Sequence, residues 1–164
     1  MISNNNELYI KPGSLGWLNY FGIPTFLIGI GLTALFIYLI KGVGLKDISI
    51  YLIVIAIGTV LYIYQKKKLK FKSLDLNIPT DLFIEKTRKL LLNEGWKIEY
   101  DNKEYLQAIY RDGLFRLDCL TIKKYKHKID YNLIHHPEDH NSIASLIDLN
   151  LKGKKTLKKI IAST

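Results

Sequence analysis

Two long apolar stretches lie in the first half of the chain. No Asp, Glu, Lys or Arg occurs in the 29 residues from Pro12 to Ile40, or in the 18 residues from Ile48 to Gln65. A helix needs about 20 largely apolar residues to cross a bilayer. We therefore predict two membrane spans, at about 17–40 and 48–65, joined by the short segment 41–47 as an antiparallel hairpin. A soluble protein would have to bury both helices, and the remainder of the chain is too small to cover them.

Beyond the second stretch, the hydrophobic pattern becomes that of a small globular domain. Pro79 and Asp81 are typical of a helix start and Gly95 of a helix end, so 81–94 is predicted to be a helix. After Gly95, apolar and polar residues alternate with the period of two that indicates strands. The apolar positions on this pattern are Trp96, Ile98, Tyr100, Leu106, Ala108, Tyr110, Phe115, Leu117, Cys119, Ile129, Tyr131 and Leu133.

Asp112 and Gly113 are a strong signal for a two-residue hairpin turn, because glycine tolerates the positive φ that such turns require. A turn of this length fixes the register of the two strands that it joins. Cys119 then becomes a small buried hydrophobe rather than a nucleophile. The predicted pairs, all on one sheet face, are Tyr110 with Phe115, Ala108 with Leu117, and Leu106 with Cys119.

The last part of the chain allows two interpretations. Segment 142–151 fits a fifth strand and equally a short helix, and Gly153 separates it from a final short helix around Leu157. We prefer the order α-β-β-β-β-β-α, an α+β domain with an antiparallel sheet of four to five strands and helices on one face. The chain then divides into a tail and two-helix membrane anchor (1–65), a basic juxtamembrane linker (66–79) and a cytosolic α+β domain (80–164).

The net charge of +9 is concentrated beside the second apolar stretch, where residues 66–72 contribute +5. Basic residues beside a span favour its cytoplasmic end and attract anionic lipid headgroups. We therefore predict a multi-pass protein of the inner (cytoplasmic) cell membrane with both termini in the cytoplasm. Charge in this place argues against long nucleic acid as a partner. The predicted membrane-surface residues are Lys66, Lys67, Lys68, Lys70 and Lys72.

The apolar stretches themselves carry little chemistry. Neither contains an ionisable residue of the kind that marks ion paths and proton relays, which argues against a transporter or a pump. Thr25, Gly29 and Thr33 recur at intervals of four, a spacing that lets helix backbones approach closely. This stripe could pack against the second span or against another subunit.

No motif in the polar part of the chain specifies a reaction. The chain has no G-x-S-x-G elbow, and it has no phosphate-binding loop or dinucleotide fingerprint. Pro137 interrupts any helix that could align the best candidate metal ligands, so we expect a polar loop there. We expect neither an enzyme, nor a metal, nor a cofactor. Those candidate ligands are His135, His136, Glu138, Asp139 and His140.

A second group of basic residues surrounds the predicted turn between the last two strands of the alternating pattern. Ammonium groups near an aromatic ring could hold phosphates while Tyr125 stacks on a base. The same residues could also form a solvated hairpin tip, or they could dock onto anionic lipid. The candidate ligand-binding residues are Lys123, Lys124, Lys126, His127 and Lys128, with Arg111 and Arg116 flanking the preceding turn.

A short membrane hairpin joined to a small cytosolic domain resembles the two-helix membrane effectors of prokaryotic antiviral defence. The resemblance covers the whole chain as architecture, without a motif that matches residue by residue. It implies a sensor that binds a cyclic oligonucleotide and, as a homo-oligomer, perturbs the membrane. The alternative is a non-enzymatic scaffold or accessory subunit of a membrane-associated complex, anchored by the same hairpin.

Overall fold

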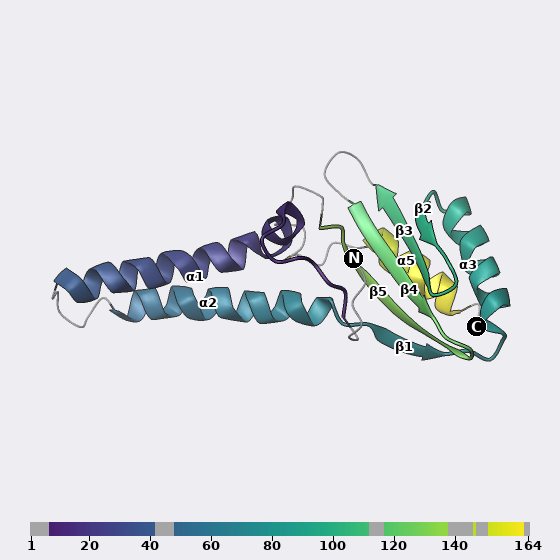
Figure 1. Ribbon diagram of the computed structural model, residues 1–164, viewed down its shortest axis with the longest axis horizontal. Coiled ribbons are helices and arrows are strands. Elements are labelled where there is room, and N and C mark those ends of the chain that lie inside the picture. Colours follow the sequence, from purple (N-terminus) through teal and green to yellow (C-terminus); the bar gives the residue numbers. More distant parts are fainter. Residues whose placement is uncertain (1–6, 42–47, 112–116, 138–145, 147–150, 163–164) are drawn as a thin grey trace.

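The computed structural model describes residues 7–41, 48–111, 117–137, 146 and 151–162. Figure 1 shows a rod of two antiparallel helices attached to one end of a small domain of strands and helices. This is the predicted helical hairpin followed by an antiparallel α+β domain. In chain order the elements are α1 (Leu15–Lys41), α2 (Ile48–Lys68), β1 (Lys72–Asp75), α3 (Thr80–Asn93), β2 (Lys97–Asp101), β3 (Tyr105–Arg111), β4 (Leu117–Lys124), β5 (Lys128–His135) and α5 (Leu151–Ile161).

Two glycines let α1 and α2 approach closely. A Cβ on Gly31 would lie 2.6 Å from Ile55 Cγ1, and a Cβ on Gly58 would lie 2.9 Å from the carbonyl oxygen of Pro24. Real Cβ atoms do not come this close to a neighbour, so any larger residue would separate the helices. The contact between α1 and α2 is therefore fixed by one glycine on each helix.

The predicted small-residue stripe does not form this contact. A Cβ on Gly29 would meet nothing within 4 Å. Thr25, Gly29 and Thr33 line an open groove of about 650 Å³ along α1, together with apolar side chains of α1 alone. Of the two alternatives for the stripe, packing against the second helix is therefore wrong.

Pro24 leaves one backbone carbonyl of α1 without its helical hydrogen-bond donor, and a side chain of α2 supplies one. Proline has no N–H, so the carbonyl of Tyr20, four residues earlier, lacks its usual helical donor. The side chain of Gln65, fully buried near the end of α2, donates from Nε2 to that carbonyl at 2.6 Å. Figure 1 shows the first turns of α1 set at an angle to the rest of the helix. Gln65 thus ties α2 to α1 at the bend.

The predicted basic linker is largely structured. Helix α2 continues through the first three lysines of 66–72 and ends at Lys68, and β1 follows within four residues. The sheet order is β1-β5-β4-β3-β2, with all neighbours antiparallel. The fifth strand therefore comes from the linker and precedes α3, rather than following the other four. The alternative fifth strand at 142–151 lies outside the described residues except at Leu146, which is helical, and Leu151, where α5 begins.

The predicted register of the β3–β4 hairpin is wrong. Ala108 pairs with Leu120, Leu106 with Ile122, and Ile109 with Cys119, a shift of three residues from the prediction. The last pair among the described residues is Arg111 with Leu117. Asp112, Gly113 and Arg116 lie outside the described residues. An odd shift turns side chains to the opposite face of the sheet. Cys119 is buried as predicted, but on the other face.

Helices α3 and α5 cover one face of the sheet, as predicted (Figure 1). Gly153 does not interrupt the last helix but lies within α5, where its N–H donates to Asp118 Oδ2 at 3.3 Å. A Cβ at this position would lie 2.9 Å from Leu133 Cδ1. The glycine therefore allows the first turn of α5 to lie against the sheet. The core on this face comprises Leu76, Phe83, Ile84, Leu91, Trp96, Leu106, Ala108, Leu120, Ile122, Ile129 and Ile160.

The opposite face of the sheet packs against the base of the rod. The segment before α1 runs beside the end of α2, where Leu8 N–H donates to the carbonyl of Leu69 at 2.9 Å. Aromatic side chains of α1 then contact β4 and β5. The rod and the domain are thus joined by a packed apolar cluster, which we call the junction cluster. Its buried members are Leu8, Ile10, Tyr20, Phe21, Leu69, Phe71, Cys119 and Ile134.

Candidate functional site

The predicted ligand-binding lysines lie around the turn between β4 and β5, which we call the hairpin tip (residues 123–128). Figure 1 shows this turn on the side of the domain away from the rod. Arg111 lies at the other end of β3, beside the start of β4. Eight residues of β4 separate the two ends by about 23 Å, at about 3.3 Å per residue. The structure therefore does not bring Arg111 into one site with the hairpin tip.

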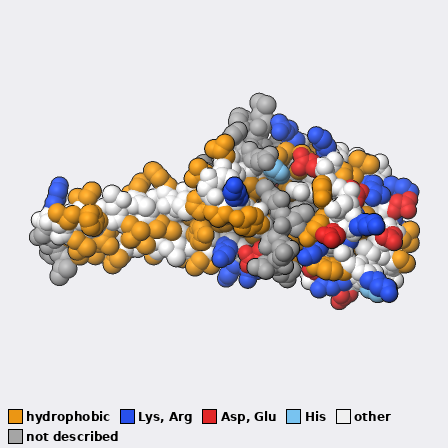
Figure 2. Space-filling model, viewed as in Figure 1, with side chains coloured by type: hydrophobic (Ala, Val, Ile, Leu, Met, Phe, Trp, Pro, Cys, Tyr) orange, Lys and Arg blue, Asp and Glu red, His pale blue; other side chains and the backbone are white. Residues whose placement is uncertain are grey.

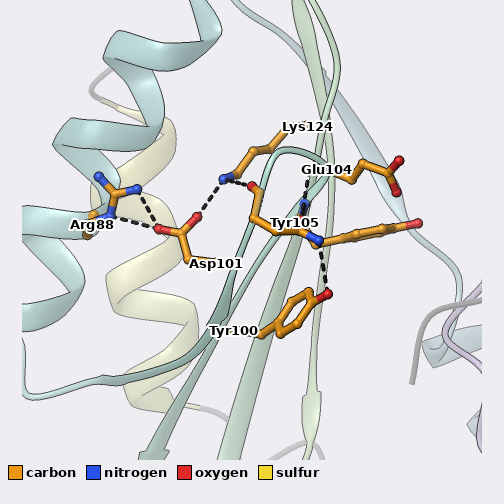
Figure 3. Close-up of polar contacts among 7 residues, drawn as sticks. Arg88, Tyr100, Asp101, Glu104, Tyr105 and Lys124 are labelled. Atoms are coloured by element: carbon orange, nitrogen blue, oxygen red, sulfur yellow. Dashed lines mark hydrogen bonds and ion pairs between the residues drawn. The ribbon is translucent and has the colours of Figure 1, made fainter.

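Most cations of the hairpin tip are engaged within the domain. Lys124 Nζ lies 2.7 Å from Asp101 Oδ1, and Arg88 contacts the other oxygen of the same carboxylate at 2.5 Å, as Figure 3 shows. Burial alone would raise the pKa of Asp101, but hydrogen bonds from Lys124 and Arg88 outweigh burial and lower it. The Asp101 carboxylate therefore stays charged and neutralises part of the tip.

The other tip lysines lie beside tyrosine rings or a carboxylate. Lys123 Nζ is 5.5 Å from the ring centre of Tyr125, and contact with Tyr125 raises the pKa of Lys123. Lys128 Nζ lies 3.5 Å from Asp130 Oδ1. Lys126 and His127 are exposed at the turn itself. Among the described residues, the tip therefore has two basic side chains, Lys126 and His127, for which no ion pair or ring contact is seen.

A second basic region lies where the rod meets the domain. A cavity of about 400 Å³, which we call the junction cavity, is bounded by the end of α2, by β1 and β5, and by one side of α5. It includes four of the five lysines predicted to face the membrane surface. Figure 2 shows Lys and Arg side chains at this boundary between the apolar rod and the charged domain. The lining residues are Tyr20, Tyr64, Lys67, Lys68, Lys70, Lys72, Tyr131, Asn132, Leu133, Ile134, His135, Lys154 and Leu157.

The junction cavity is strongly electropositive. Five lysines line it, and none of its lining residues within the described part of the chain is acidic. Lys68 Nζ lies 4.4 Å from the ring centre of Tyr64 and donates to the carbonyl of Leu146 at 3.4 Å. Lys67, Lys70 and Lys72 have no ion-pair partner among the described residues. Like charges around one cavity repel one another, so an anion bound among them would be stabilised.

Asn132 connects the wall of the cavity to the end of α2. Its side chain is buried on β5, and Nδ2 donates to the carbonyls of Lys68 and Lys70, each at 2.8 Å. These carbonyls lie where α2 ends and the chain turns towards β1, a place where helix carbonyls lack internal partners. Asn132 therefore fixes the direction in which the lysine-bearing segment leaves the helix.

The remaining candidate chemistry is structural. Cys119 is fully buried, and burial raises the pKa of its thiol to about 11 although Gln107 Nε2 donates to Sγ at 3.1 Å. The thiol therefore stays protonated and unreactive at neutral pH. His135 and His136 are buried, while Glu138, Asp139 and His140 lie outside the described residues. Within the described part of the chain, no group of three or more possible metal ligands occurs.

The sequence identified the lysines of the cavity but assigned them only to the membrane surface. It named His135 only as a candidate metal ligand, and it missed Asn132 and Lys154. These residues come from distant segments and reach the lysine run only through pairing of β1 with β5 and packing of α5. Comparison of the chain with protein-family models, with curated proteins and with solved structures finds no match.

Proposed function

We propose that the protein is a membrane-anchored sensor and effector. In this proposal α1 and α2 cross the bilayer, one of the two lysine-rich regions of the domain binds a small anionic ligand, and binding alters the arrangement of the spans. The best candidate ligand is a cyclic oligonucleotide messenger, and the acting form is a homo-oligomer that perturbs the membrane. The protein carries out no catalysis.

The exposed apolar surface of the rod supports insertion into a bilayer. Only 17 % of the most apolar part of α1 and 11 % of that of α2 is buried. Phe26, Ile40 and Val60 are each at least 65 % exposed. A core helix of a soluble protein would hide such side chains, whereas lipid chains solvate them. Figure 2 shows that hydrophobic side chains gather along the rod.

The distribution of lysines supports a cytoplasmic domain. Lys41 ends α1 at the far end of the rod, whereas five lysines lie at or just beyond the end of α2 beside the domain. Basic residues accumulate on the cytoplasmic side of a membrane, so the domain and the segment before α1 would lie there. We therefore propose the inner (cytoplasmic) cell membrane as the location of the protein.

The observation that carries the sensor proposal is the shared junction between rod and domain. Tyr20 and Phe21 of α1 pack into the junction cluster with Cys119 and Ile134 of the sheet. The last turn of α2 supplies two of the cavity lysines, Lys67 and Lys68. Gln65, at the start of that turn, donates a hydrogen bond to the carbonyl of Tyr20 in α1. A ligand bound in the domain would therefore act on residues that also fix the ends of both spans.

The test uses the full-length protein reconstituted in dye-filled liposomes, with a panel of cyclic oligonucleotides added outside. A true ligand at 100 times its Kd should stabilise the protein by about 2.7 kcal/mol, and the same messenger should release dye. Empty liposomes and linear oligonucleotides serve as controls. Absence of both responses with every messenger would contradict the proposal. If the protein then co-purified stably with one membrane-associated complex, the second function, a scaffold or accessory subunit, would be favoured.

A further inference from the structure

We propose that the junction cavity, rather than the hairpin tip, is the binding site, and that its ligand carries two or more phosphate groups on an aromatic or apolar body. This inference rests on the proposed sensor function and names the location and ligand chemistry of its site. Both a soluble nucleotide and the phosphorylated headgroup of a lipid have this chemistry.

The contrast in lysine pairing favours the cavity. Outside it, Lys89, Lys124 and Lys152 each lie within 2.7 Å of a carboxylate oxygen. At the cavity, Lys67 and Lys70 have no such partner among the described residues. Lys67 and Lys70 thus lie beside a hollow without a carboxylate partner among the described residues. Phosphate oxygens are the natural partners of clustered ammonium groups because each contact is charge-assisted.

The volume and the lining of the junction cavity indicate a ligand larger than a single phosphate group. A volume of about 400 Å³ lies within the range of small-molecule sites, and it exceeds what one phosphate group fills. The cavity has aromatic and aliphatic walls from Tyr64, Tyr131, Leu133 and Leu157, beside the lysines. Such walls suit a base, a ring or the glycerol end of a lipid, while the ammonium groups contact the phosphates.

The cavity also explains how binding could reach the spans. Its cations come from three separate elements, with Lys68 on α2, Lys72 on β1 and Lys154 on α5. A polyphosphate bound to all three would link them, since each contributes at least one contact. Asn132 already holds the end of α2 against β5, so a shift of these elements would be transmitted to the helix end.

The experiment compares three double variants of the full-length protein in nanodiscs, of which the cavity and control variants each remove two lysines. The cavity variant is K70Q/K72Q, the tip variant is K126Q/H127Q, and the control variant is K86Q/K97Q. All six side chains are exposed, so folding should be retained, and circular dichroism checks it. In the soluble arm, cyclic di-AMP and inorganic triphosphate are titrated into phosphatidylcholine nanodiscs. In the lipid arm, one-fifth of the phosphatidylcholine is replaced by cardiolipin and the thermal midpoint is measured.

In the soluble arm, we expect the cavity variant to weaken triphosphate binding by about tenfold or more, because two charge-assisted contacts disappear. In the lipid arm, we expect the same variant to lose the cardiolipin-dependent rise in thermal midpoint. The tip and control variants should weaken triphosphate binding less than about threefold and should keep the rise in thermal midpoint, as expected for screened surface charges. A response in only one arm identifies the source of the ligand.

Three results would overturn the inference: equal weakening in all three variants, loss in the tip variant alone, or no binding in either arm. Dye release by messengers tests the proposed function separately from the cavity assignment. If a messenger releases dye from liposomes that contain K70Q/K72Q at the same half-effective concentration as from liposomes with wild type, the sensor proposal stands and the cavity assignment fails. If no messenger acts on the wild type but the cavity variant alone loses cardiolipin binding, the cavity assignment stands and the sensor proposal fails.

Discussion

Single side chains in the domain owe their charge state to their immediate neighbours. Cys119 is buried in the junction cluster, and burial raises the pKa of its thiol to about 11. Glu94 lies between Lys152 and Lys159 of α5, with Lys152 Nζ 2.6 Å from its carboxylate, and those contacts lower the pKa of Glu94 to about 2. The first residue is therefore an inert neutral group, and the second is a charged link between α3 and α5.

The ion pairs of Glu94 should make the thermal stability of the fold depend on pH in the acidic range. A carboxyl whose pKa falls on folding contributes stability above its unfolded pKa, near 4.5, and loses it as the pH falls towards its folded pKa of about 2. Glu94→Gln should therefore lower the thermal midpoint at neutral pH, and the difference from wild type should shrink between pH 4.5 and 2. Thermal melts across this range measure it.

The matched control for this prediction is Glu104→Gln, which removes an exposed carboxylate with no ion-pair partner among the described residues. It should leave the midpoint at neutral pH close to that of wild type. A gap between Glu94→Gln and wild type that stays constant down to pH 2 would show that the ion pairs do not stabilise the fold.

At the scale of elements, the sequence predicted what is local and missed what is not. Helices α1 and α2 follow from long apolar runs, and α3 follows from its helical spacing of apolar residues between Pro79 and Gly95. Strand β1 has only four residues, begins inside a lysine run, and exists because Ser73 and its neighbours pair with distant β5. The β3–β4 register failed for the same reason. A two-residue turn was inferred at Asp112, whereas contacts between strands set the pairing at Arg111 and Leu117.

The contact between α1 and α2 offers a direct test with an internal control. Gly58→Leu should destabilise the hairpin by about 1–3 kcal/mol, because the new side chain collides with the backbone of Pro24 and Ile28. Gly29→Leu introduces the same side chain into the open groove of α1 and should leave the hairpin intact. Unfolding of the full-length protein by increasing SDS in detergent micelles measures both, and equal midpoints for the two variants would refute the packing.

At the scale of the whole molecule, the candidate site arises from the way rod and domain are joined. The sequence predicted two spans, a basic segment after them and a small α+β domain, and each of these is local. It could not predict that Asn132 and Lys154 come to the same cavity, because that requires the complete sheet with α5 packed on it. The structure does not bring Arg111 to the hairpin tip, because Arg111 lies at the opposite end of β4.

The central claim is that the rod crosses a membrane with the domain on the cytoplasmic side. Because Cys119 is buried and its pKa is raised, the wild type should stay unlabelled by maleimides and provides a silent background. Two exposed lysines can then report on the two ends of the molecule. Lys41→Cys marks the far end of α1, and Lys103→Cys marks the domain between β2 and β3.

The most direct measurement is labelling of these two variants in intact spheroplasts with a membrane-impermeant maleimide, before and after lysis. We expect Lys41→Cys to be labelled from outside, whereas Lys103→Cys should be labelled only after lysis. Labelling of Lys103→Cys in intact cells, or equal labelling of both positions in either state, would contradict it.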